Sequence, residues 1–165
     1  MRKIICLLLC CVSLVLCFGC TEKAPAPQEG TLFYYPKADL SFQPGSTSFD
    51  TEARSLENPG TWVQVLNIYF AGPESEHLLS PFPAGLQAQQ ATMERNTVII
   101  TVSDHLASLT GLDLTIACSC LSLTALALTG AETVVIHAEG TLLDGQKSIT
   151  MDKNTLLLLD NWQEE

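Results

Sequence analysis

The chain has 165 residues, a formal net charge of −10 at pH 7, and apolar residues at 47% of its positions. The excess of acidic over basic side chains excludes nucleic-acid binding through many phosphate contacts, and it excludes a polybasic surface that would hold anionic lipids. The length suits one globular domain, which can bury enough apolar surface to fold unaided.

The first 19 residues have the pattern of an export signal. Arg2 and Lys3 precede an uncharged apolar run at positions 4–18. About 15 apolar residues match the core of a signal peptide, whereas a membrane-spanning helix needs roughly 20. We therefore predict that residues 1–19 are a signal peptide and take no part in the fold.

A cysteine stands at the border of this apolar run. The segment LCFGC (16–20) resembles a bacterial lipobox, with Gly19 before the cleavage point and Cys20 as the first mature residue. It departs from that pattern where Cys17 replaces the usual leucine and where Phe18 is bulky. Two or more acyl chains, such as palmitate, hold a protein stably on a bilayer because each buried methylene contributes about 0.8 kcal/mol. We expect lipidation of Cys20 and a location on the extracytoplasmic face of the cell membrane; an uncleaved anchor and ordinary secretion are the alternatives.

Residues 20–30 are predicted to be the lipidated cysteine and a flexible tether, because prolines and charges alternate there without an apolar cluster. The folded domain is then expected over residues 31–165. Only two of the seven cysteines fall in it, Cys118 and Cys120. They stand two residues apart in a predicted helix, where their side chains point to different sides, so we expect two buried thiols and neither a disulfide nor a zinc site.

The first half of the domain predicts two strands and a helix. TLFYYPK (31–37) and FDTEARSLE (49–57) are predicted strands, the second ended by an Asn-Pro-Gly turn. The segment 61–72 changes to helical period, with Thr61 as N-cap and a Gly-Pro step as the stop. Its predicted apolar face consists of Trp62, Val65, Leu66, Tyr69 and Phe70.

The segment 73–85 contains three prolines and is predicted to be a long loop. Its apolar side chains either cover the core or form a surface for partners. These candidate partner-binding residues are Leu78, Leu79, Pro81 and Phe82. The loop also carries Glu74, Glu76 and His77, for which we favour a solvated surface over a metal site.

The segments LQAQQATME (86–94) and NTVIITVSD (96–104) predict a strand pair with its turn at Arg95-Asn96. Alternation in the second strand predicts that Val98, Ile100 and Val102 share one face.

The run LTIACSCLSLTALAL (114–128) favours a buried helix that ends at a Thr-Gly step, and its small polar residues make it too short an apolar run to span a bilayer. ETVVIHAEG (132–140) predicts a strand, Asp144-Gly145 a tight turn, and TLLLLD (155–160) a last strand or turn.

The predicted order is β, β, α, β, β, α, β, β. This order indicates an α+β single domain with a mixed, largely antiparallel sheet and two main helices packed on one face.

The order and spacing of these segments resemble the GerMN domain of bacterial envelope lipoproteins. The resemblance covers roughly residues 31–150 and departs from the family at 121–124, where Leu-Ser-Leu-Thr replaces a Thr-Leu step. The segments that carry it are LFYYP (32–36), LNIYFAGPESEHLLSPFPAG (66–85), NTVIITVSD (96–104), IACSCLSLTAL (116–126) and ETVVIHAEGTLLDG (132–145).

This resemblance implies a fold similar to the ring-building modules of secretion systems. It also implies a non-enzymatic role in sporulation or germination, in which the domain helps to assemble a protein complex in the cell envelope. Envelope proteins and further copies of the chain are the partners that it implies.

Catalytic motifs are not evident in the sequence. Asp104, His105 and Ser108 lie close together along the chain, but no nucleophile elbow, zinc-protease motif or phosphate-binding loop accompanies them. We expect no catalytic residues, no metal and no cofactor, and we interpret the chain as a membrane-anchored protein-interaction module. A small-molecule-binding lipoprotein is the alternative, and it predicts a closed apolar pocket.

Overall fold

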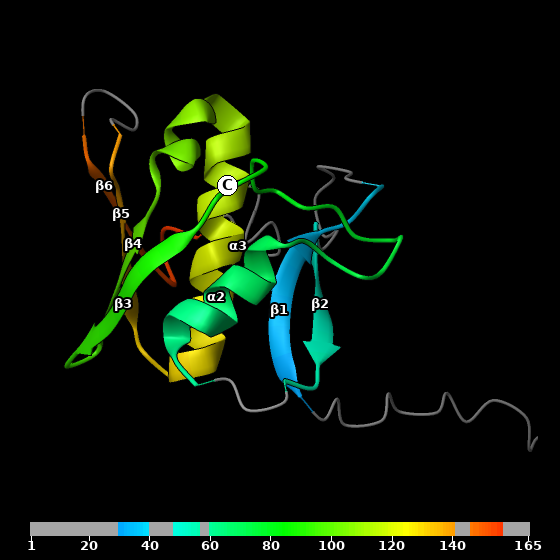
Figure 1. Ribbon diagram of the computed structural model, residues 1–165, viewed down its shortest axis with the longest axis horizontal. Coiled ribbons are helices and arrows are strands. Elements are labelled where there is room, and N and C mark those ends of the chain that lie inside the picture. The colour runs from blue at the N-terminus through cyan, green and yellow to red at the C-terminus, as the bar shows by residue number, and fades with distance from the viewer. Residues whose placement is uncertain (1–29, 40–47, 57–59, 141–145, 157–165) are drawn as a thin grey trace, which may run out of the picture.

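The computed structural model describes residues 30–39, 48–56, 60–140 and 146–156. The predicted signal peptide, the lipidation of Cys20, the tether and the turn at Asp144-Gly145 lie outside these residues. The described elements form three layers: a four-stranded sheet, two α-helices, and a two-stranded hairpin (Figure 1).

The hairpin consists of β1 (Thr31–Pro36) and β2 (Phe49–Arg54), which pair antiparallel as a sheet of their own. Both strands were predicted. The edge of β1 that faces the helices does not pair with another strand. One of its main-chain donors is satisfied instead by α3, because the N–H of Tyr34 donates to the side-chain oxygen of Thr124 at 2.9 Å. This contact fixes the hairpin against the central helix, so the strands divide into two sheets with the helices between them.

Helix α2 (Trp62–Phe70) begins at the predicted N-cap. The side chain of Thr61 accepts from the N–H of Gln64, and the side chain of Gln64 accepts from the N–H of Thr61, which is a capping box. The predicted apolar face is buried at four positions, Val65, Leu66, Tyr69 and Phe70. The fifth, Trp62, is 43% exposed, so its assignment to the core is corrected: as the first helical residue it projects beyond the packed turns.

The main sheet has the order β3 (Ala88–Glu94), β4 (Thr97–Val102), β5 (Thr133–Ala138) and β6 (Ser148–Asp152). Strands β3 and β4 form the predicted hairpin, and its turn holds Arg95 at a φ of 56°. Strands β4 and β5 are parallel, whereas β6 returns antiparallel to β5. The sheet is thus mixed and largely antiparallel, as predicted, and the alternation predicted for β4 is confirmed.

Helix α3 (Gly111–Thr129) joins the two parallel strands and follows a short 3-10 helix, η1 (Asp104–Ser108). It begins three residues before the predicted start. With 19 residues it is, by length and composition, apolar enough to cross a membrane, which corrects the prediction that this run is too short. More than half of the apolar stretch is buried within the domain, as in the core helix of a soluble protein. Gly130, in the left-handed region at φ 70°, ends the helix.

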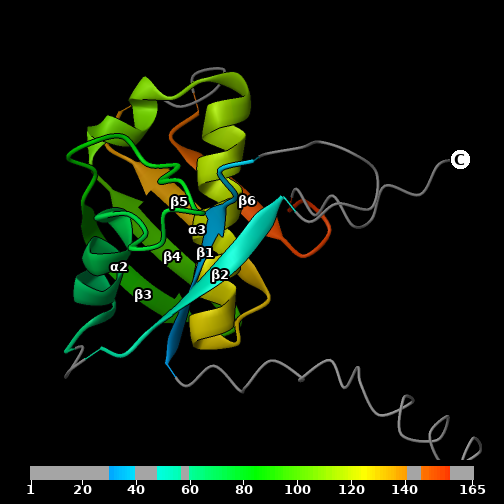
Figure 2. The same cartoon turned by 90° about the vertical axis from the view of Figure 1, so that its right-hand side faces the viewer.

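Both helices cover the same face of the main sheet, with α2 against β3 and α3 against β4, β5 and β6 (Figures 1 and 2). The other side of α3 packs on β1. One continuous group of buried apolar side chains joins all three layers. The predicted α+β single domain is confirmed.

The chain after β6 closes a turn, because the N–H of Thr155 donates to the carbonyl of Asp152 and Leu156 is buried. The rest of the segment 155–160 lies outside the described residues.

Candidate functional site

Two apolar surfaces lie at opposite ends of α3. The first, which we call the distal groove, lies where the loop 73–85 passes the start of α3 and the end of β1. The second, which we call the proximal surface, lies where the start of α2 meets the end of α3 and the strand β3.

The loop 73–85 is held to the hairpin by an ion pair on β2. The carboxylate of Glu52 accepts hydrogen bonds from the N–H groups of Glu74 and Ser75, both at 2.9 Å, and it pairs with the guanidinium of Arg54. Arg54 in turn donates to the carbonyl of Gly72. Burial alone would raise the pKa of Glu52, but the N–H of Ser75 and the charge of Arg54 outweigh it, so this pKa lies below its ordinary value.

The same loop is bonded to the end of β1. The N–H of Leu79 donates to the carbonyl of Pro36, and the N–H of Ala38 donates to the carbonyl of His77, each at 2.9 Å. Successive side chains of an extended segment point to opposite sides. Leu78 therefore enters the core, at 8% exposed, while Leu79 is 47% exposed.

The structure thus divides the four candidate partner-binding residues. Leu78 and Phe82 are buried and belong to the core, which was the alternative interpretation of the loop. Leu79 and Pro81 line the distal groove, a hollow of about 290 Å³ that Leu109 and Ile116 complete. Phe82 also borders the groove but is only 8% exposed, so Leu79 is the candidate that presents most of its surface to a partner.

The distal groove is mostly apolar, with one carboxylate at its rim. Asp113 is the acidic residue among those that line it, and it stands in the first turn of α3. Leu112, its neighbour, is 51% exposed. Exposed apolar side chains beside a hollow are typical of surfaces that bind a partner.

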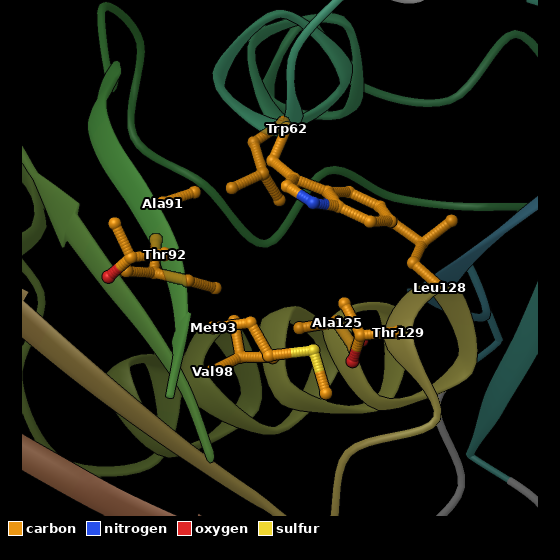
Figure 3. Close-up of a pocket in the computed structure, with 10 residues that line it drawn as sticks. Trp62, Ala91, Thr92, Met93, Val98, Ala125, Leu128 and Thr129 are labelled. Atoms are coloured by element: carbon orange, nitrogen blue, oxygen red, sulfur yellow. The ribbon is translucent and has the colours of Figure 1, made fainter. Parts of the chain in front are cut away.

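The proximal surface is built around Trp62. Its indole lies over Leu128 of α3, and Met93 of β3 lies below it (Figure 3). The slot between them has a volume of about 10 Å³, which is about one water molecule and too little for a ligand. Met93 is 48% exposed, so the slot is the floor of an open surface, unlike the closed pocket that small-molecule binding predicts.

The residues around His105 do not have the geometry of a catalytic triad. Asp104 Oδ1 and Ser103 Oγ both lie near the same ring nitrogen, His105 Nδ1, at 3.2 and 3.3 Å. A triad places the carboxylate and the nucleophile on opposite nitrogens of the ring. Ser108, the serine suggested by the sequence, donates instead to the carbonyl of His105 at 2.7 Å.

The other polar candidates do not gather either. Glu74 Oε1 lies 3.8 Å from Arg54 Nε, and within the described parts of the chain no three metal-ligating side chains come together. Cys118 and Cys120 are free thiols in the core, as predicted. Burial raises the pKa of Cys118 to about 12 and that of Cys120 further, so both remain protonated and unreactive at neutral pH.

Comparison of the chain with protein-family models, with curated proteins and with solved structures finds no match. The resemblance to the GerMN domain therefore depends on the order and spacing of the segments alone.

Sequence reasoning missed the exposed side of the proximal surface. Trp62 was assigned to the core because it fits the helical period, and Met93 was not singled out. The position of Trp62 directly after the N-cap Thr61 was an available signal, because a side chain in the first turn has fewer helical neighbours to pack against. Sequence reasoning also missed the pair of Glu52 and Arg54, which the strand period places on one side of β2.

Proposed function

We propose that this chain is a membrane-anchored lipoprotein on the extracytoplasmic face, whose domain binds other envelope proteins without catalysing a reaction. The observation that carries the proposal is the border at Gly19-Cys20, where an uncharged apolar run preceded by Arg2 and Lys3 gives way to a polar, proline-containing segment. A signal of this length with a cysteine at its end is typical of acylated envelope proteins. The resemblance to the GerMN domain favours a role in assembly during sporulation or germination.

The distal groove supports the interaction part of the proposal. Leu79 is held outward by the bond from its N–H to Pro36, and Leu112 is exposed in the first turn of α3, whose start borders the distal groove. The ion pair of Glu52 and Arg54 stiffens the loop that carries Leu79. An apolar surface that is already ordered loses less conformational entropy on binding, which favours a protein partner.

The lipid anchor is tested by labelling the cells with an alkyne analogue of palmitate and measuring the intact mass of the purified chain. We expect label and an acylated N-terminus at Cys20, and loss of both in Cys20→Ser. The matched control is Cys10→Ser, which alters a cysteine of the signal outside the segment LCFGC and should leave the label in place. A mature chain that carries no acyl group at residue 20 would overturn the proposal.

The interaction is tested by placing a photo-crosslinking amino acid at Leu79 in the native cell. We expect crosslinks to envelope proteins or to further copies of the chain, identified by mass spectrometry. The same probe at Thr150, exposed on the uncovered face of the main sheet, is the control. Equal crosslinking from both positions, or none from Leu79, would contradict a docking role for the distal groove.

A further inference from the structure

The proximal surface lies where the chain enters the domain. A hollow of about 350 Å³ beside Trp62 is lined by Thr31, Thr61 and Leu128, and Thr31 is the first residue of β1. In both views of the fold, the start of β1, the start of α2 and the end of α3 lie at the same end of the molecule (Figures 1 and 2). Thr31, at the start of the described domain, therefore lies next to Trp62.

The length of chain between Cys20 and the domain limits how far this end can lie from a lipid anchor. Cys20 and Gly30 are ten residues apart, and ten residues span at most about 35 Å even when fully extended. Helix α3 has 19 residues and is about 28 Å long, and it separates the proximal surface from the distal groove. An anchor at Cys20 therefore keeps the proximal surface within about 35 Å of the bilayer. This reach exceeds the length of α3, so the orientation of the domain depends on the chemistry of the surface itself.

The chemistry of the surface suits the boundary between lipid headgroups and acyl chains. None of the described residues that line the slot or the adjoining hollow carries a charge. Trp62 presents an apolar ring with one N–H, which is the combination enriched at membrane interfaces, and Met93 adds an exposed flexible apolar side chain. Covering the lining residues with lipid removes apolar area from water, and none of them carries a charge that would lose its water.

We propose that the proximal surface rests on the bilayer, with Trp62 inserted at the boundary between headgroups and acyl chains. This inference rests on the proposed lipid anchor at Cys20. The contact gives the domain one orientation, in which α3 points away from the membrane and the distal groove faces the envelope space. Because the chain is acidic overall, the contact depends on apolar burial and not on anionic lipids.

The test uses the mature acylated chain in phosphatidylcholine vesicles, some of which contain phosphatidylcholine brominated along its acyl chains. Trp162 is replaced in Trp162→Phe, so that Trp62 is the single tryptophan. We expect brominated lipid to quench the fluorescence of Trp62 and the emission of Trp62 to shift to shorter wavelength on reconstitution. We also expect dissolved iodide to quench Trp62 less in the vesicle-bound chain than in the chain that is free in solution. High salt should leave all three effects unchanged.

The matched control moves the reporter to the other end of α3. Trp62→Phe and Trp162→Phe are combined with Leu112→Trp, at an exposed position in the first turn of α3. This distal reporter should be accessible to iodide and untouched by brominated lipid. If brominated lipid quenches both reporters, the proposed orientation is wrong. If brominated lipid quenches neither reporter, the proposed lipid contact is wrong and the proximal surface is free for a protein partner. Circular dichroism confirms that each variant folds.

Failure of the anchor can be distinguished from failure of this inference. If the cell does not acylate residue 20, a maleimide phospholipid is coupled to Cys20 of the same mature chain, where Cys118 and Cys120 are buried and protonated. Quenching of Trp62 in that form supports the membrane-facing surface even when natural acylation is absent. If Trp62 is not quenched in a chain that is held on the vesicle, the membrane-facing surface is wrong, and the proposed lipid anchor at Cys20 is not affected.

Discussion

The hydroxyl of Tyr35 donates to the carbonyl of Tyr69 at 2.8 Å, and the hydroxyl of Tyr69 donates back to the carbonyl of Tyr34 at 2.5 Å. The two rings lie 4.9 Å apart in the core. Each ring thus satisfies a main-chain carbonyl on the opposite element, which joins β1 to the last turn of α2. Because burial raises the pKa of both hydroxyls, both remain donors at every physiological pH.

Removing either hydroxyl should weaken the domain. We expect Tyr35→Phe and Tyr69→Phe each to lower the free energy of unfolding by about 1–2 kcal/mol, because each change removes a side-chain hydrogen bond to a main-chain carbonyl. The double variant should lose less than the sum, since the two rings are in contact. Tyr34→Phe, on the more exposed side of β1, is the control and should change stability by less than about 0.5 kcal/mol. Urea unfolding measures all four; a double variant that loses the full sum would show that the bonds act independently.

The ion pair under the loop predicts a dependence on pH. The pKa of Glu52 is lower in the folded chain than its ordinary value of 4.5, so ionised Glu52 contributes stability that is fully present above about pH 4.5. That contribution is lost as pH falls through the lowered pKa. Glu52→Gln should therefore be less stable than the wild type at pH 7, and the difference should shrink in acid. Melting temperatures measured from pH 7 to pH 2.5 test this, and two parallel profiles would refute it.

Two neighbouring leucines of the loop should respond differently to the same change. Leu78→Ala should lower the free energy of unfolding by about 2–4 kcal/mol, because it leaves a cavity in the core. Leu79→Ala should change it by less than about 0.5 kcal/mol, because that side chain is about half exposed. In the cell, Leu79→Asp should abolish crosslinking from a probe placed at Pro81, which lines the same groove, while the domain stays folded. Comparable destabilisation at both positions would mean that the loop packs differently.

The hydroxyl of Ser119 should be dispensable. It is fully buried in α3 and has no hydrogen-bond partner within the part of the chain that the structure describes. We expect Ser119→Ala to raise the free energy of unfolding by about 1 kcal/mol, since it removes an unsatisfied polar group and alanine favours a helix. Thr124→Val in the same helix is the matched control and should cost about 1–2 kcal/mol, because the N–H of Tyr34 loses its acceptor. Equal effects of Ser119→Ala and Thr124→Val on the free energy of unfolding would contradict this explanation.

The elements that were predicted well are those whose signal is local. Thr61 and the helical period gave α2, and the alternation of Val98, Ile100 and Val102 gave β4 with its buried face. The start of α3 was predicted three residues late, because Gly111 stands in the left-handed region at φ 56° and gives no helical signal in the sequence. The division of the loop into core and surface also escaped prediction, since composition does not show which of Leu78 and Leu79 turns inward.

By itself, the sequence determined the order of strands and helices, the acidic surface and the burial of the two cysteines, because caps, periods and charge act between neighbours along the chain. Only the tertiary structure decided that the hairpin stands apart from the main sheet and that Arg54 holds the loop. It alone placed Trp62 beside Thr31, at the end where the chain enters. These relationships join residues tens of positions apart, and which of them come together depends on how the three layers pack, which no local pattern records.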